Sequence, residues 1–90
     1  MPTVTRTVRI NNDLGVHLRA AGALVQLASR FRADLWIEHG PRRANAKSIM
    51  SVLTLAAARG VDVTLVGEGD DAESAVQAIE ALILRGFESL

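Results

Sequence analysis

The chain contains three segments in which apolar and polar positions alternate, and each segment predicts a β-strand with one solvated face. The first covers residues 3–10, where Arg6 interrupts the inner apolar row. The second lies within residues 33–40, and a Gly-Pro pair then signals a turn into a short further strand within residues 42–46. The third covers residues 61–67 and ends at a glycine-rich turn. We therefore expect four strands, two of which form a hairpin.

Three other segments carry apolar residues at helical spacing. The first predicts a helix of about residues 18–31, the second runs from Ser48 to a stop at Gly60, and the third follows a pair of aspartates and ends near Gly86. The order of elements is βαββαβα. Because the short turn at Gly40 requires antiparallel pairing, we expect an α+β open-faced β-sandwich, in which three helices cover one face of a four-stranded antiparallel sheet.

Length and composition indicate a single small domain. The 90 residues contain no linker, internal repeat or low-complexity segment, so one domain spanning residues 1–90 accounts for the chain. Hydrophobic residues make up 49% of the sequence, which is enough to build a core at this size. The absence of cysteine excludes a disulfide framework and a thiolate metal site, and it suits a reducing compartment. We therefore expect a cytoplasmic protein.

Charge and hydropathy argue against two classes of partner. Ten basic residues balance ten acidic ones, so the summed field gives no general attraction for nucleic acid or for anionic lipid. No apolar run approaches the ~20 residues needed to cross a bilayer, and the N-terminal stretch MPTVTRTVRI contains no apolar targeting segment. We expect neither nucleic acid nor a membrane as a partner, so any anion-binding site must be local.

The stretch LGVHLRAA, residues 14–21, carries the candidate chemistry. A neutral imidazole is a good nucleophile, and a helix that begins just after His17 directs unpaired backbone N–H groups at its surroundings. Arg19 adds a planar cation that matches phosphate oxygens. The helix end and the guanidinium both favour a neutral ring at about pH 7 and stabilise an anionic adduct. A phosphoryl group suits this arrangement, although an isolated His-x-Arg also fits a histidine that merely caps a helix.

Two motifs together identify a family. Residues 15–21 read GVHLRAA and residues 45–52 read NAKSIMSV, and each lies at the start of a predicted helix. The sequence resembles the histidine-containing phosphocarrier proteins (HPr) of the bacterial phosphoenolpyruvate-dependent phosphotransferase system. Their first motif runs glycine, aliphatic, histidine, small residue, arginine, proline, alanine. The resemblance covers nearly all of the chain, because the βαββαβα order also matches.

The resemblance implies a role for each residue of the first motif. His17 is the residue that Enzyme I phosphorylates on its ring at the expense of phosphoenolpyruvate, and the group then passes to a IIA protein. Arg19 steadies the phosphoryl group in transit. Since each partner brings its own reacting group into line, we expect no cofactor and no metal in this domain. We also expect a monomer.

The chain departs from the family pattern at two positions. Ala20 replaces the usual proline, and Leu18 replaces the usual small residue. Alanine is an excellent helix former and restores a backbone N–H, so we expect the helix start to survive. Leu18 would enlarge an apolar rim for partner helices. The expected partner-binding residues are Leu18, Ala20, Lys47, Ile49, Met50 and Leu53.

Ser48 has two interpretations. Serine is among the preferred N-cap residues, and an amphipathic run follows it directly. The resemblance implies a second role, because an ATP-dependent HPr kinase/phosphorylase modifies the serine of this motif in the family as a regulatory mark. A phosphate there would add about two negative charges beside Ile49 and Met50. It would block the docking of Enzyme I or create a site for a regulator.

Two other classes of function stay open. A regulatory protein-binding module with little or no phosphoryl transfer fits the departures at Leu18 and Ala20, whereas His17 and Arg19 argue against it. A small acylphosphatase-type hydrolase fits the length and the α+β layout, but its glycine-rich phosphate loop near the first strand is missing. Within the family, the C-terminal ILRGFESL weakly favours the nitrogen-type regulatory branch over sugar uptake.

Three further features receive no functional role. We expect His39 in solvent at the hairpin tip, because the sequence offers no second ligand at metal-binding spacing. Trp36 falls on the outer face of its predicted strand. The GEGDD of residues 67–71 lacks the Gly-Lys-Ser/Thr ending of a P-loop, so a strand-to-helix turn explains it better.

Overall fold

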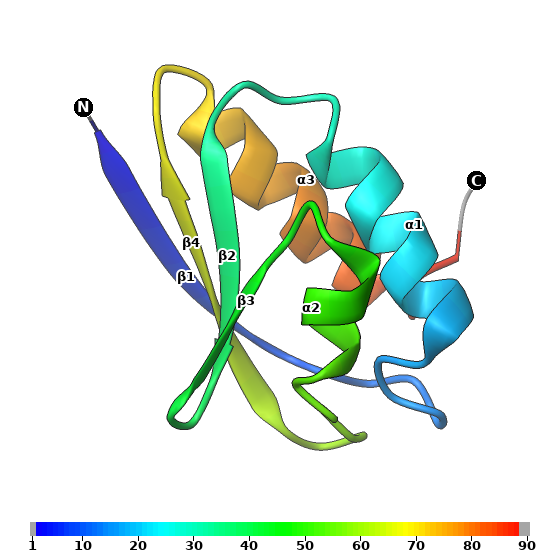
Figure 1. Cartoon of the computed structure of the whole chain (residues 1–90). Coiled ribbons are helices and arrows are strands. Elements are labelled where there is room, and N and C mark those ends of the chain that lie inside the picture. The colour runs from blue at the N-terminus through cyan, green and yellow to red at the C-terminus, as the bar shows by residue number, and fades with distance from the viewer. Residues whose placement is uncertain (1, 89–90) are drawn as a thin grey trace.

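An antiparallel sheet carries a layer of helices on one face, and the computed structural model describes residues 2–88 of the chain (Figure 1). The strands and helices, in chain order, are β1 (Thr3–Arg9), α1 (Leu18–Ala28), β2 (Asp34–His39), β3 (Arg42–Asn45), α2 (Ile49–Leu53), β4 (Asp62–Glu68) and α3 (Ala72–Leu84). The sheet order is β1-β4-β2-β3, and every neighbouring pair is antiparallel. The predicted fold class and element order are confirmed.

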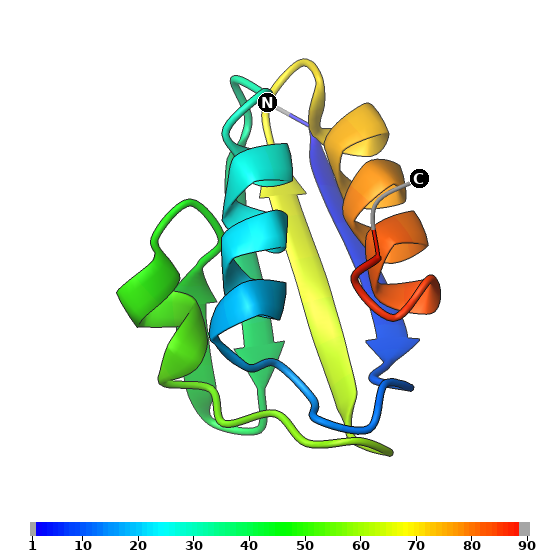
Figure 2. The same cartoon turned by 90° about the vertical axis from the view of Figure 1, so that its right-hand side faces the viewer.

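The core lies between the sheet and the helices, which all cover the same face (Figure 2). The register aligns Val8 with Val63 and Ile37 with Leu65, so apolar side chains of three strands form continuous rows beneath α1 and α3. Full burial of one such side chain stabilises the fold by about 1.5–3 kcal/mol. The alternation read from the sequence therefore places the correct face of each strand inward.

The second helix is much shorter than the run from Ser48 to Gly60 predicts. It ends at Leu53, and Ala56 adopts a positive φ of 49°. The prediction was wrong because the segment after α2 serves a different contact: the carbonyl of Ala57 accepts a hydrogen bond from the N–H of Val16 at 2.9 Å. A continued helix would direct that carbonyl along its own axis.

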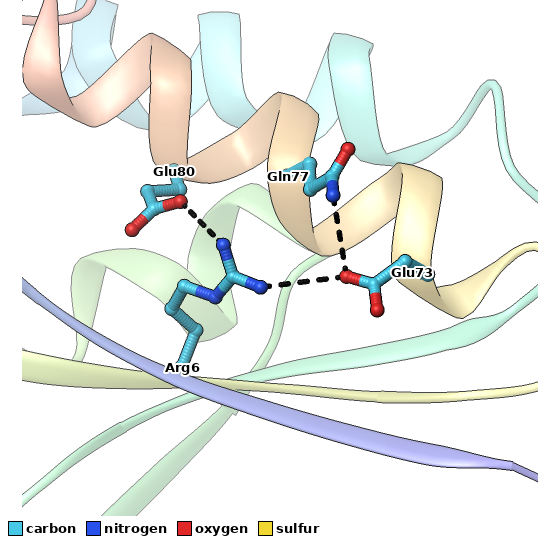
Figure 3. A network of polar contacts seen from close by, with 4 residues as sticks. All are labelled: Arg6, Glu73, Gln77 and Glu80. Atoms are coloured by element: carbon cyan, nitrogen blue, oxygen red, sulfur yellow. Dashed lines mark hydrogen bonds and ion pairs between the residues drawn. The ribbon is translucent and has the colours of Figure 1, made fainter.

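Arg6 occupies the inner row of β1, as the alternation predicts, and faces α3 at the margin of the core (Figure 3). Its Nη1 donates to Oε1 of Glu80 at 2.9 Å, and its Nη2 donates to Oε2 of Glu73 at 3.4 Å. Gln77 donates to the same Glu73 oxygen at 3.5 Å. An inward charge is tolerated here because the network satisfies it while leaving it half-exposed to water.

The segment 67–71 leads from strand to helix as predicted, with Gly67 and Glu68 ending β4 and residues 69–71 forming the turn. Asp71 occupies the N-cap position of α3, yet its carboxylate makes no cap hydrogen bond to its own helix. Instead it accepts the N–H groups of Arg32 and Ala33 at 2.9 and 2.8 Å. These backbone donors, with that of Arg32 the largest cause, lower the pKa of Asp71 below its ordinary value. The acid thus ties the loop after α1 to the start of α3.

The hairpin of β2 and β3 carries two ring side chains, Trp36 and His39, which lie in different environments. Trp36 lies on the outer face of the sheet, as predicted, with the guanidinium of Arg43 4.2 Å from the ring centroid. The expectation that His39 stands in solvent was wrong. His39 is half-buried, and its Nδ1 lies 3.1 Å from the carbonyl oxygen of Leu55. The hairpin end is therefore anchored to the loop that follows α2.

Candidate functional site

The loop before α1 is held in place by backbone contacts. Gly15 has a φ of 64°, and a Cβ built on it would overlap the carbonyl oxygen of Ala57, so only glycine fits here. The side-chain amide of Asn12 donates to the Gly15 carbonyl at 2.7 Å. Together with the bond from Val16 to Ala57, these contacts fix the point from which the chain enters α1.

His17 is the N-cap residue of α1, and its ring accepts hydrogen bonds from the first turn of the helix, as the side chain of a serine or aspartate usually does at this position. Its Nδ1 accepts the backbone N–H groups of Arg19 at 3.2 Å and Ala20 at 3.4 Å. This network assigns the neutral ring a proton on Nε2 and a lone pair on Nδ1. A nucleophilic nitrogen therefore faces the positive end of a helix dipole.

The first turn of α1 presents its residues to different environments. Leu18 is 67% exposed and Arg19 is exposed, whereas Ala20 is only 1% exposed. Within residues 2–88, the guanidinium of Arg19 forms no hydrogen bond or ion pair with another side chain. A multi-donor cation without such a partner is available to an incoming anion.

A hollow of about 580 Å³ lies around His17. Its walls come from the loop and first turn of α1 and from the segment after α3: Leu14, His17, Leu18, Arg19, Ala20, Gly86, Phe87 and Glu88. Leu14 and the segment 86–88 were not predicted as parts of this site. Gly86 was recognisable as a helix stop, but no sequence signal indicated that the chain after it returns to His17.

The second predicted region lies on α2, which packs against α1. Ser48 is the N-cap of α2, and its Oγ accepts the N–H of Ser51 at 3.3 Å, so the predicted capping role is confirmed. Met50 is 75% exposed and Ile49 is also exposed, whereas Leu53 is half-buried. These apolar side chains and Leu18 are thus presented on adjoining helices.

Two of the expected partner-binding side chains are placed elsewhere. The methyl group of Ala20 is buried in the core, so only its backbone reaches the site. The Nζ of Lys47 donates to the carbonyl oxygen of Phe31 at 2.7 Å. Phe31 follows the C-terminal end of α1, whereas His17 lies at the N-terminal end. The structure therefore does not present either side chain as a surface contact beside His17.

Two further properties of the described part of the chain concern metal binding and membrane insertion. Among residues 2–88, no cluster of histidine and acidic side chains has the arrangement needed to hold a metal ion. In the same range, none of the helices is long and apolar enough to span a bilayer.

Comparisons with known proteins agree with this geometry. The family described as "PTS HPr component phosphorylation site" matches residues 4–84. The phosphocarrier protein HPr of Treponema pallidum is 46% identical, with 94% of this chain and 97% of that protein covered. The phosphocarrier protein NPr of Shewanella violacea is 42% identical, covering 98% and 97%.

Solved structures show the same fold. The HPr of Thermoanaerobacter tengcongensis superposes with a TM-score of 0.88 at 42% identity and full coverage of both chains. Crh, the catabolite repression containing protein of Bacillus subtilis, was solved as a domain-swapped dimer and superposes with a TM-score of 0.76 at 32% identity, covering 96% of this chain and 99% of that one. The resemblance inferred from the two motifs is confirmed. This chain belongs to the HPr family of phosphocarrier proteins of the phosphotransferase system.

Proposed function

We propose that His17 accepts a phosphoryl group from phosphorylated Enzyme I and passes it to a IIA protein. The observation that carries this proposal is the position of Nδ1, which has its lone pair at the start of α1, within 3.2 Å of the backbone nitrogen of Arg19. The guanidinium of Arg19, which pairs with no side chain among residues 2–88, and the open hollow around the ring support it further. An anionic group fits such a helix end.

In the transfer step, the Nδ1 lone pair attacks phosphorus while the bond from phosphorus to the donor breaks and the donor keeps the electron pair. The proton on Nε2 stays in place, so the ring becomes a phosphorylated imidazolium and no base has to remove a proton. The N–H groups of α1 and the Arg19 side chain offset the charge on the phosphoryl oxygens. In the second transfer, a nucleophile of the IIA protein attacks phosphorus, the bond from phosphorus to Nδ1 breaks, and Nδ1 regains its lone pair.

The partners dock on exposed apolar side chains of α1 and α2, beginning at Leu18 directly after His17. Leu18, Ile49 and Met50 are exposed, and Leu53 lies half-buried beneath them on α2. Apolar residues with this exposure are suited to contact a helix of a partner protein. We assign the protein to the cytoplasm and expect a monomer. Because Crh forms a swapped dimer, the molar mass in solution should be measured.

Ser48 is a site of regulation in this proposal. Its hydroxyl group lies at the start of α2, directly before the exposed Ile49 and Met50. A phosphate added there by an HPr kinase/phosphorylase places about two negative charges within the apolar docking surface. Such a charge must lose its hydration when a partner covers it, so phosphorylation of Ser48 weakens the docking of Enzyme I.

A regulatory binding module is the second candidate, and the likeness to Crh favours it. The similarity to NPr, with the C-terminal ILRGFESL, favours the nitrogen-type branch over sugar uptake within the leading proposal. The two candidates differ in one property. A carrier turns over phosphoryl groups at His17, whereas a binding module recognises partners without turnover.

The test is phosphorylation of the purified protein by its cognate Enzyme I and phosphoenolpyruvate. Mass spectrometry should locate one acid-labile, base-stable phosphate on His17. The phosphate should disappear in His17→Ala and persist in His39→Ala, which removes the other histidine. Addition of the IIA protein should then discharge it. Partner binding without any phosphate on His17 would establish the binding module instead.

A further inference from the structure

The backbone N–H of Ala20 points at the reacting nitrogen. The Ala20 nitrogen lies 3.4 Å from Nδ1 of His17, to which its N–H donates a hydrogen bond. A proline at this position, usual in related proteins, has no N–H to offer. We propose that the N–H of Ala20 is a catalytic group that binds an oxygen of the phosphoryl group on His17. This inference rests on the proposed function of His17.

The pattern of backbone bonds at the start of α1 supports this assignment. The N–H of Ala21 already donates to the carbonyl of His17 at 2.8 Å, so the intrahelical ladder begins there. The N–H groups of Arg19 and Ala20 lie before the ladder, and both use Nδ1 as their acceptor. Formation of the nitrogen–phosphorus bond consumes the Nδ1 lone pair. Both donors must then find another acceptor.

Burial decides what that acceptor is for Ala20. The residue is only 1% exposed, so water has little access to its N–H. A buried N–H without an acceptor is costly, whereas phosphorus takes the position of the lone pair and carries anionic oxygens around it within reach of the donor. The bond to an anionic oxygen is also stronger than the bond to neutral imidazole. Phosphorylation therefore strengthens the contact with Ala20 instead of breaking it.

The consequence is a more stable phosphohistidine than a proline variant would form. Exchange of a neutral for a charge-assisted hydrogen bond is expected to shift the equilibrium of phosphoryl exchange roughly tenfold toward this protein. Hydrolysis of the phosphohistidine should also be slower than in a proline variant. Ala20 thus sets how tightly the carrier retains its phosphoryl group.

The experiment loads the group chemically, with phosphoramidate, so that its outcome does not depend on Enzyme I. Four proteins are compared: the wild type, Ala20→Pro, Ala20→Gly, and a semisynthetic ester in which lactic acid replaces Ala20. Proline and the ester both remove the N–H, and only proline adds a ring. Glycine keeps the N–H and serves as the matched control. Circular dichroism verifies that each variant is folded.

We expect the Ala20 amide proton to move downfield on phosphorylation of His17 in ¹H–¹⁵N spectra of the wild type. We expect Ala20→Pro and the ester to lose phosphate roughly ten times faster than the wild type, and Ala20→Gly to behave like the wild type. An unmoved Ala20 proton with equal rates in all four proteins would overturn the inference. If Enzyme I fails to phosphorylate His17 while the chemically loaded protein shows these effects, the carrier proposal fails and the Ala20 contact stands.

Discussion

Substitution of Gly15 tests whether the contact between the loop before α1 and the loop after α2 holds His17 in place. Alanine at the observed φ of 64° costs roughly 1–2 kcal/mol. Its Cβ would also displace the Ala57 carbonyl, which breaks or stretches the buried hydrogen bond from Val16, at a cost of about 1–3 kcal/mol. Reduced freedom of the unfolded chain returns about 0.4–1 kcal/mol.

The net expectation for Gly15→Ala is a loss of roughly 1–5 kcal/mol, centred near 3 kcal/mol, in the free energy of unfolding. Gly40→Ala is the matched control, because Gly40 has a similar φ of 57° but no atom within 4 Å of a built Cβ. It should lose only about 1 kcal/mol. At this chain length each kcal/mol lowers the melting temperature by about 4–8 °C, so thermal melts separate the two variants.

The functional readout is the initial rate of phosphorylation by Enzyme I, measured well below both melting temperatures. Gly15→Ala should slow the reaction, because displacement of the loop shifts the His17 ring relative to α1. Gly40→Ala should leave the rate unchanged. Equal melting temperatures for the two variants would refute the reasoning, since the contact with Ala57 would then contribute nothing beyond the left-handed backbone.

Three further predictions address other parts of the molecule. Asp71→Asn should destabilise the protein at neutral pH. Because the pKa of Asp71 is lowered in the folded state, the carboxylate stabilises the fold above the pKa of the unfolded state, and this stabilisation is lost as the pH falls through the pKa of the folded state. The free energies of unfolding of variant and wild type, measured in urea, should therefore converge in acid. Met50→Asp should raise the KM for Enzyme I without changing stability, while Ser74→Asp, exposed at the far end of α3, should leave the KM unchanged. Arg6→Met should cost at most about 1 kcal/mol in urea unfolding at low salt, and the difference should shrink in concentrated salt.

The strands and the long helices were predictable because each has a periodic apolar face. Val63 and Leu65 alternate with polar residues along β4, and the buried residues of α3 recur at helical spacing. The length of α2 was not predictable in this way. Ala56 and its neighbours are compatible with a helix. The segment is instead held by tertiary contacts, among them the hydrogen bond that the N–H of Val16, 41 positions earlier in the sequence, donates to the carbonyl of Ala57.

The candidate site was partly predictable for a similar reason. His17 and Arg19 lie in one short motif at a helix start, and such local motifs can be read from sequence. The burial of Ala20 and the contact of Lys47 with Phe31 depend on how α1, α2 and the loop after α1 pack together. The approach of the segment 86–88 to His17 is likewise a tertiary contact between distant parts of the chain. No local pattern reports such contacts.

The place of the segment 86–88 in the wall around His17 also governs how the protein should be handled. An affinity tag or surface linkage attached after this segment would begin beside the reactive ring and compete with incoming proteins. The other end of the chain enters β1, whose seven residues span roughly 20 Å before the chain turns toward His17. Immobilisation for binding measurements therefore belongs at the N-terminus, with the reactive end of the molecule left facing the solution (Figure 2).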